Sequence, residues 1–149
     1  MPKITGKRGI DYIGVGVGAV IINSKNEILL LLRKKPPEAD YWTIPGGAVE
    51  WFETCEDALI RECREEIGAK VKIVKLLTVV DHIVRDEGIH WISSEYLVKL
   101  MSPVKISNFE KTESQKMKWF PISHLPEKIT LTTREAVKHY LIYRAYYSK

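Results

Sequence analysis

The chain has 149 residues, of which 23 are lysine or arginine and 19 are aspartate or glutamate, so its formal net charge is +4 at pH 7. Hydrophobic residues make up 45% and charged residues 28%, which is the balance of an ordinary globular domain and excludes a disordered or collagen-like chain. We therefore expect a single domain over residues 1–149. The small basic excess suits an anionic ligand and does not favour nucleic acid as a partner.

No segment has the character of a membrane span or an export signal. The longest charge-free stretch, residues 12–24, is shorter than the roughly 20 apolar residues that cross a bilayer. On one helix, Cys55 and Cys63 would lie about 12 Å apart, too far for a disulfide. We expect a cytoplasmic protein with no membrane partner, and a homodimer is left open.

The first third of the chain predicts strands and a loop. Residues 15–22 and 27–32 are apolar runs around the turn 23–26, a pattern typical of a hairpin. Residues 14–19 also have the spacing of a dinucleotide-binding glycine loop, but that motif requires a helix after it. Because these glycines lie within a strand pattern, we interpret them as permitting close backbone approach. A loop over 34–40 and a short strand over 41–44 follow.

The rest of the chain predicts two helices separated by strands. A helix is expected over 55–67, with Thr54 as its N-cap, Asp57 in the capping-box position and Gly68 as its stop. The other expected elements are strands at 71–80, 90–100 and 117–122, a turn at 85–88, and a last helix from Thr132 to about Tyr147. Helices flanking a mixed sheet predict an α/β (α+β) fold.

Acidic residues gather around the first helix. Glu62, Glu65 and Glu66 stand at positions i, i+3 and i+4, so their side chains project from one face. Glu53 adds a carboxylate at the start of the helix. A solvated acidic face explains such a group, but clustered hard oxygens are also what Mg²⁺ or Mn²⁺ requires. The residues alone leave both interpretations open.

The spacing of these acids is specific. Gly47 is followed by five residues, Glu53, seven residues and then the run 61–69, Arg-Glu-Cys-Arg-Glu-Glu-Ile-Gly-Ala. This segment resembles the Nudix box, G-x5-E-x7-R-E-U-x-E-E-x-G-U, where U is bulky and aliphatic. Every charged and glycine position matches, whereas Cys63 and Ala69 are smaller than the U residues. The resemblance implies a MutT-like Nudix hydrolase domain, an α/β/α sandwich with a mixed sheet between helices.

The resemblance also implies an activity and a set of roles. Nudix hydrolases cleave a nucleoside diphosphate linked to a group X, with Mg²⁺ or Mn²⁺ as cofactor and a nucleotide or nucleoside diphosphate derivative as partner. By this resemblance Glu65 and Glu66 would ligate metal, Gly46 would offer its carbonyl, and Glu62 would be a further ligand or the base. Arg61 would hold Glu53 in place.

Two further residues are candidates for substrate binding. Arg33 follows the second predicted strand and would meet phosphate, although a solvated basic face explains it equally well. In the Nudix family an acid outside the box often closes the metal site or acts as base. Glu110, Glu113 and Glu95 are the candidates here. We choose Glu110, because Asn108-x-Glu110 resembles a segment of nucleoside triphosphate hydrolases.

Subgroup markers after the box narrow the substrate by elimination. Positions 84–86 lack the proline that goes with ADP-ribose hydrolases, and 87–88 lack the tyrosine of dinucleoside polyphosphate hydrolases. The sequence therefore favours a nucleoside triphosphate-type pyrophosphohydrolase. Alternatives left open are an ADP-ribose or nucleotide-sugar pyrophosphatase, an RNA 5′-end-processing enzyme and a non-catalytic nucleotide-binding Nudix module.

Overall fold

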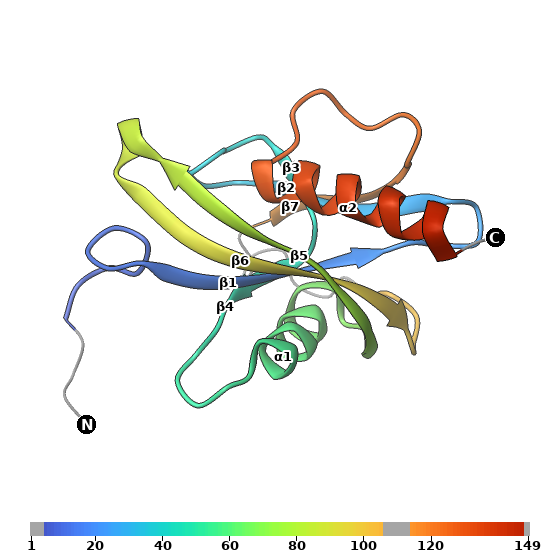
Figure 1. Cartoon of the computed structure of the whole chain (residues 1–149), viewed down its shortest axis with the longest axis horizontal. Helices are drawn as coiled ribbons and strands as arrows, with labels where there is room; N and C mark the ends of the chain where they lie inside the picture. Colours follow the sequence, from blue (N-terminus) through green and yellow to red (C-terminus); the bar gives the residue numbers. More distant parts are fainter. Residues whose placement is uncertain (1–4, 106–113, 148–149) are drawn as a thin grey trace.

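The computed structural model describes residues 5–105 and 114–147, which contain two β-sheets and two α-helices (Figure 1). The helices are α1 (Cys55–Ile67) and α2 (Leu131–Tyr147), and a short 3₁₀ helix, η1, covers Arg85–Glu87. The strands are β1 (Gly14–Ile21), β2 (Glu27–Arg33), β3 (Trp42–Thr43), β4 (Gly46–Ala48), β5 (Val71–Val84), β6 (Ile89–Leu100) and β7 (Ser114–Pro121). One sheet has the order β4–β1–β6–β5 and the other β3–β2–β7.

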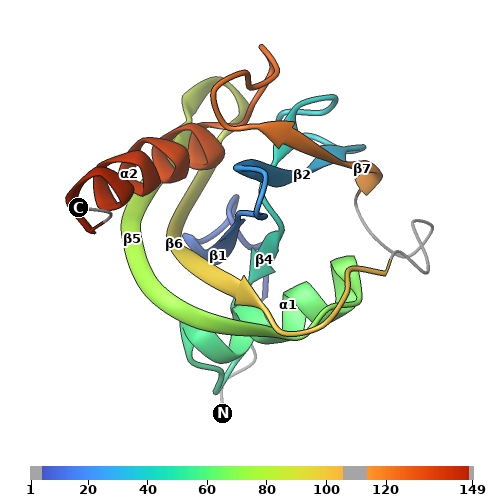
Figure 2. The same ribbon diagram turned by 90° about the vertical axis from the view of Figure 1, so that its right-hand side faces the viewer.

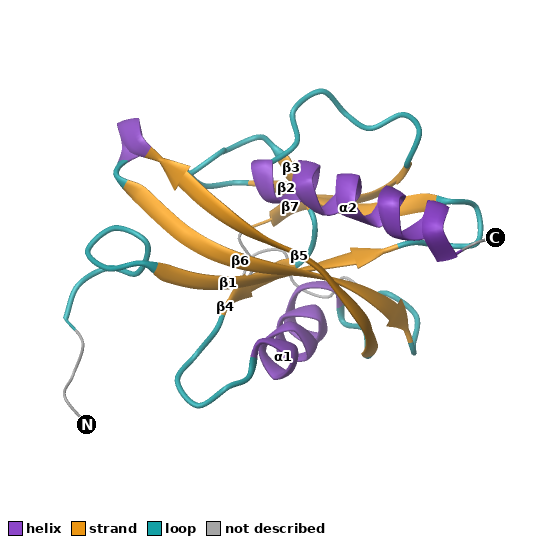
Figure 3. Cartoon of the chain, viewed as in Figure 1, coloured by secondary structure: helices purple, strands orange, loops and turns teal. Residues whose placement is uncertain are grey.

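The two helices lie on opposite sides of the four-stranded sheet, which gives the layered α+β architecture that the sequence predicts (Figures 1 and 3). Alternate residues of β1 and β2 bury into two separate apolar clusters, because successive strand side chains point to opposite faces. Val17 and Leu29 pack in the cluster with Leu59 of α1, whereas Val20 packs in the cluster with Val137 of α2. Among the described residues, no helix is long and apolar enough to cross a membrane.

β1 and β2 are strands as predicted, but the predicted hairpin between them is wrong. β1 pairs along its whole length with β6 in parallel and also pairs antiparallel with β4. β2 pairs along its whole length with β7 and also with β3. In the described part of the chain the bridge between Ile22 and Ile28 links the two segments. Both strands bury both faces, so long-range ladders with β6 and β7 replace the local ladder of a hairpin.

Helix α1 has the bounds and caps that the sequence predicts. The side-chain Oγ1 of Thr54 accepts a hydrogen bond from the backbone N–H of Asp57 at 3.0 Å. At the other end Gly68 adopts a left-handed conformation, φ 60°, and its N–H donates to the carbonyl oxygen of Arg64 at 3.1 Å. Strand β4, in contrast, was not expected, because its three residues follow Pro45 and read as a loop.

The two cysteines are free thiols. Cys63 is buried in the cluster beneath α1, and Cys55 packs against the same cluster. Burial, together with smaller contributions from the nearby carboxylates of Glu66 and Glu62, raises the pKa of Cys63 to about 12. Cys63 is therefore an unreactive core residue, as the sequence suggests.

We expect Gly68→Ala to destabilise the fold more than Gly88→Ala does. Both glycines have left-handed φ angles, 60° and 64°, which cost an alanine about 1 kcal/mol. A Cβ at Gly68 would also lie 2.3 Å from the carbonyl oxygen of Lys105, whereas a Cβ at Gly88 meets nothing within 4 Å. Urea unfolding of both variants measures the difference. Equal losses of unfolding free energy in the two variants would mean that the backbone at Lys105 moves away from the new Cβ at no cost in stability.

Candidate active site

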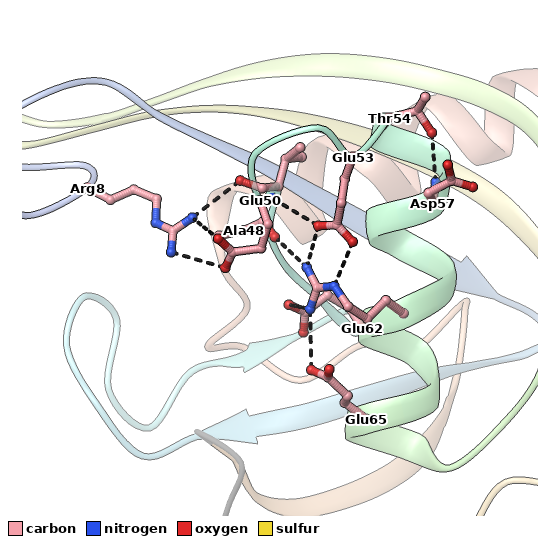
Figure 4. Close-up of polar contacts among 10 residues, drawn as sticks. Arg8, Ala48, Glu50, Glu53, Thr54, Asp57, Glu62 and Glu65 are labelled. Carbon is pink, nitrogen blue, oxygen red and sulfur yellow. Dashed lines mark hydrogen bonds and ion pairs between the residues drawn. The ribbon is translucent and has the colours of Figure 1, made fainter. Parts of the chain in front are cut away.

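Arg61 on α1 is the centre of the polar contacts that organise the site. Figure 4 labels its partners Ala48, Glu53, Glu62 and Glu65. The Nε of Arg61 donates to Oε2 of Glu53 at 2.8 Å and its Nη2 donates to Oε1 of Glu53 at 2.9 Å, so this ion pair is bidentate. Nη2 also donates to the carbonyl oxygen of Ala48 at 3.0 Å. Nη1 donates to Glu62 Oε1 at 2.8 Å and to Glu65 Oε2 at 3.3 Å. One guanidinium thus ties strand β4, the loop before α1 and two helix glutamates together.

The glycines of β4 bring the strand against the helix acids. The backbone N–H of Gly46 donates to Oε1 of Glu66 at 2.8 Å. A Cβ at Gly47 would lie 2.3 Å from Cδ of Glu62, so a larger residue would push this carboxylate away. A Cβ at Gly46 would lie 2.0 Å from the carbonyl oxygen of Val17 on β1. Glycine is therefore a steric requirement at both positions.

The carboxylates of this cluster have different environments. The hydrogen bonds from Arg61, with a smaller contribution from the backbone N–H of Glu50, lower the pKa of Glu53 from 4.5 to about 2. Burial raises the pKa of Glu62, although Arg61 opposes this effect. Glu65 is 59% exposed. Three carboxylates contact one guanidinium, so the cluster has a net negative charge that a bound cation would offset.

The helix acids open into a cleft of about 1520 Å³ that is lined by residues of both sheets. Glu62, Glu65 and Glu66 line it together with Gly46 and Gly47. The cleft is larger than the 300–1,000 Å³ of common small-molecule pockets, so it can accept a ligand with several distinct groups. The structure thereby brings together five of the residues that the sequence singled out.

Arg33 lies at the end of β2 and also lines the cleft. Its Nε donates to the carbonyl oxygen of Pro37 at 2.9 Å, and its Nη2 donates to that of Lys35 at 3.5 Å. The guanidinium thus braces the loop that follows β2, and its contact with phosphate stays a prediction. Glu110 and Glu113 lie outside the described residues, so their roles stay predictions as well.

Glu95 on β6 is the acid that the sequence ranks last, yet it is the most buried of the acids that line the cleft. Its side chain is fully buried, and neither carboxyl oxygen has a hydrogen-bond partner in the described part of the chain. The sequence feature that could have indicated a functional role for Glu95 is the presence of a charged residue in the middle of an apolar strand. Strand alternation alone does not say which face of the sheet it occupies.

The donor set of the cleft fits a divalent metal ion. Among residues 5–105 and 114–147, no three acidic, histidine or cysteine side chains are already arranged as ligands. Glu62 and Glu65 turn towards Arg61, and Glu66 turns towards the N–H of Gly46, so metal binding would exchange these contacts. Carboxylate and carbonyl oxygens from the cleft are nevertheless the hard ligands that Mg²⁺ and Mn²⁺ take.

The site and fold match a known family. The family model of the NUDIX domain matches residues 13–140. An ADP-ribose pyrophosphatase of Methanocaldococcus jannaschii is 32% identical over 121 residues, which are 81% of this chain and 69% of that protein. An RNA pyrophosphohydrolase of Orientia tsutsugamushi is 35% identical over 133 residues, 88% of this chain and 73% of that protein. The crystal structure of a MutT NUDIX hydrolase from Burkholderia pseudomallei covers 87% of this chain and 98% of its own, with 37% identity and a TM-score of 0.79.

A mixed α+β fold with a complete box at one cleft defines a pyrophosphohydrolase. The chain belongs to the Nudix family, and it is a hydrolase that acts on nucleoside diphosphate derivatives. Hydrolases of this family generally need a divalent cation.

The Glu53–Arg61 ion pair should make stability depend on pH in a defined window. The pKa of Glu53 in the folded chain, about 2, lies below its ordinary value of 4.5, so the stabilisation is complete above pH 4.5 and is lost as the pH falls towards 2. We expect Glu53→Gln to lower the free energy of unfolding at pH 6, and this deficit should shrink between pH 4.5 and 2. Urea unfolding at a series of pH values measures it.

Arg61→Gln is the matched control for this experiment, because it removes the other half of the same ion pair. In the Arg61→Gln background, replacing Glu53 by Gln should produce no deficit that shrinks in this window. A deficit in the single variant that stays constant down to pH 2 would contradict the assignment.

Proposed function

We propose that the chain is a pyrophosphohydrolase of the nucleoside triphosphate type that works with Mg²⁺ or Mn²⁺. The observation that carries the proposal is the complete set of box acids, Glu62, Glu65 and Glu66, lining one cleft beside two close-packed glycines. The absence of the two subgroup markers at positions 84–88 supports the choice of substrate. All box glutamates are present, which argues against a module that only binds nucleotides.

The charges of the cleft suggest which role each residue would have in binding the cation and in hydrolysis. A divalent cation supplies neutralisation of the diphosphate oxygens and lowers the pKa of the attacking water. Glu65 and Glu66, with the carbonyl of Gly46, would hold the cation, and Glu62 would complete this set or orient the water. Arg61 would act as a positioning residue, because its guanidinium is engaged with Glu53, Ala48 and Glu62. Water attacks phosphorus, and the bond from phosphorus to the leaving phosphate oxygen breaks.

A second candidate function is removal of diphosphate from RNA 5′ ends. The relative from Orientia tsutsugamushi, which supports it, carries the name RNA pyrophosphohydrolase and aligns with 88% of this chain. A panel of the four nucleoside triphosphates, ADP-ribose and a 5′-triphosphorylated oligonucleotide, with products identified by mass, separates these functions. A kcat/KM for the oligonucleotide well above that for every free nucleotide would overturn the first choice.

The first expected result is that Glu66→Gln lowers kcat on the best substrate of the panel by about a hundredfold or more. The substitution keeps the side-chain size and an oxygen that can accept from the N–H of Gly46, but it removes one charge from the proposed metal set. Glu127→Gln is the control, because Glu127 is exposed and lies outside the cleft lining. Near-normal kcat of Glu66→Gln at saturating Mg²⁺ would remove Glu66 from the metal set.

The second expected result is that Mg²⁺ stabilises the folded chain through linkage. Binding to the native acids alone should add about 2.7 kcal/mol to the unfolding free energy at a hundred times the Kd. Thermal unfolding with Mg²⁺ and with EDTA measures the shift in Tm. The shift should be much smaller in Glu65→Gln/Glu66→Gln than in Glu56→Gln/Glu127→Gln, which loses the same number of charges. Equal shifts in both variants would place the cation elsewhere.

A further inference from the structure

A row of glycines forms the floor of the cleft beside the box acids. Gly14, Gly16 and Gly18 alternate along β1, so all three present their missing side chains to one face of the sheet. β6 runs parallel to β1 and places Trp91, Ser93 and Glu95 opposite these glycines in register. Figure 2 shows β1 between β6 and β4, with the sheet curving around it.

Two side chains of β6 occupy the space above the outer glycines. A Cβ at Gly14 would lie 2.5 Å from ring atoms of Trp91, so the indole covers this position. A Cβ at Gly18 would lie 2.0 Å from Oε2 of Glu95 and 2.7 Å from Cδ1 of Ile44. The carboxyl of Glu95 therefore lies over Gly18, at the end of the row where Ile44 closes it.

The middle glycine differs from its neighbours. A Cβ at Gly16 would meet only ordinary contacts, with the Gly47 carbonyl oxygen at 3.5 Å, Ser93 Oγ at 3.5 Å and the Trp91 ring at 3.6 Å. Gly16 lies about 7 Å along the strand from Gly14 and from Gly18. The floor at Gly16 thus has an aromatic ring on one side and a carboxyl group on the other, and Gly16, Trp91 and Glu95 all line the cleft.

The carboxyl group of Glu95 has unused hydrogen-bonding capacity in the described part of the structure. Both of its oxygens are buried, and neither has a partner at hydrogen-bond distance in the described ranges, although the Ser93 hydroxyl group is close enough to interact with the carboxyl group and lower its pKa. Burying a polar group without a partner costs about 1–3 kcal/mol, so a fold retains one where something else completes it. The imidazole of His82, which lowers the pKa of Glu95 electrostatically, is engaged by Glu38, whose Oε1 lies 3.1 Å from its Nε2.

We propose that Glu95 recognises the nucleobase of the substrate, and that its carboxyl group binds the edge on which a ring nitrogen acceptor adjoins an exocyclic amino group, as in adenine and cytosine. The inference rests on the proposed function, because it takes a nucleotide as the occupant of the cleft. The base lies over Gly16 against Trp91, and the phosphates reach the helix acids, which line the same cleft.

The burial of Glu95 selects this type of edge over that of guanine. A neutral carboxylic acid presents one O–H donor and one carbonyl acceptor, which match the ring nitrogen and amino group of adenine or cytosine. Burial raises the pKa of Glu95 to about 7, against smaller lowering effects of Ser93 and His82, so the neutral acid is available near neutral pH. Guanine and uracil offer a neutral acid only a carbonyl oxygen beside a ring N–H, and this oxygen is a weaker acceptor for an acid O–H than the ring nitrogen of adenine or cytosine. The two adjacent donors of guanine would instead require a buried carboxylate close to the substrate's phosphates, and its charge is costly there.

The test compares Glu95→Gln and Glu95→Leu in equilibrium binding of AMP, CMP, GMP and UMP without divalent metal. Glutamine keeps one donor and one acceptor, so it should retain the preference for AMP or CMP, whereas leucine should lose about tenfold or more of that preference. Leucine replaces an unpaired buried carboxyl, so the variant should fold, and its Tm verifies this. Gly16→Ala fills the floor at tolerable distances and should weaken all four nucleotides alike.

Several outcomes would overturn the inference. If GMP binds most tightly, and both Glu95 variants lose this preference, then Glu95 binds guanine as a carboxylate that accepts hydrogen bonds from two donors. Equal binding of all four nucleotides, or full binding to Gly16→Ala, would place the base elsewhere. Unchanged base preference with a lower kcat in both Glu95 variants would make Glu95 part of the hydrolytic machinery. Monophosphate binding needs neither metal nor turnover, so failure of the chain to hydrolyse any nucleotide would refute the proposed function and leave this result readable.

Discussion

The bidentate ion pair between Arg61 and Glu53 is the interaction on which the geometry of the acidic site depends. Arg61 stands on the helix, Glu53 stands in the loop before it, and the same guanidinium also reaches the carbonyl oxygen of Ala48 on β4. A guanidinium can satisfy these acceptors at once because its donors form a rigid planar fork, which lysine lacks. The pair thus fixes the helix against the strand that carries the glycines, and Glu62 approaches that strand as a consequence.

Glycines on two neighbouring strands complete what the ion pair begins. Gly46 and Gly47 let β4 approach both β1 and the helix acids, and the alternating glycines of β1 make room for Trp91 and Glu95 of β6 and leave only ordinary contacts at Gly16. The same absence of side chains therefore has two effects, close packing at the acids and open space in the cleft. The dinucleotide-loop spacing of residues 14–19 is explained by this strand role, and no helix follows it.

Short sequence patterns predicted most of the helices and strands, whereas the arrangement of the strands in sheets depends on pairing between residues far apart in the chain. The bounds of α1 follow from Thr54 and Gly68, whose capping is determined within a few residues of the chain. The strands that pair with β1 could not be predicted in this way. When both faces of a strand are buried, its hydrophobic pattern does not indicate which strand lies beside it. The box acids were predicted from spacing, but the burial of Glu95 depends on the register between β6 and β1, which places its carboxyl over Gly18.

Burial separates the acids of the cleft into two chemical types. The helix glutamates Glu62 and Glu65 contact the guanidinium of Arg61, and Glu65 is largely exposed, so this end of the cleft combines several carboxylates with one cation. Glu95 is fully buried, and among the described residues no ion pair with it is found, so burial raises its pKa and its neutral form can donate as well as accept a hydrogen bond. A nucleotide also has two chemically different ends. Its phosphates are anionic and require cations, whereas its base is polar and uncharged. The cleft offers acids paired with Arg61 to one part and an acid without such a partner to the other, and the difference arises from the surroundings of the glutamates rather than from residue type.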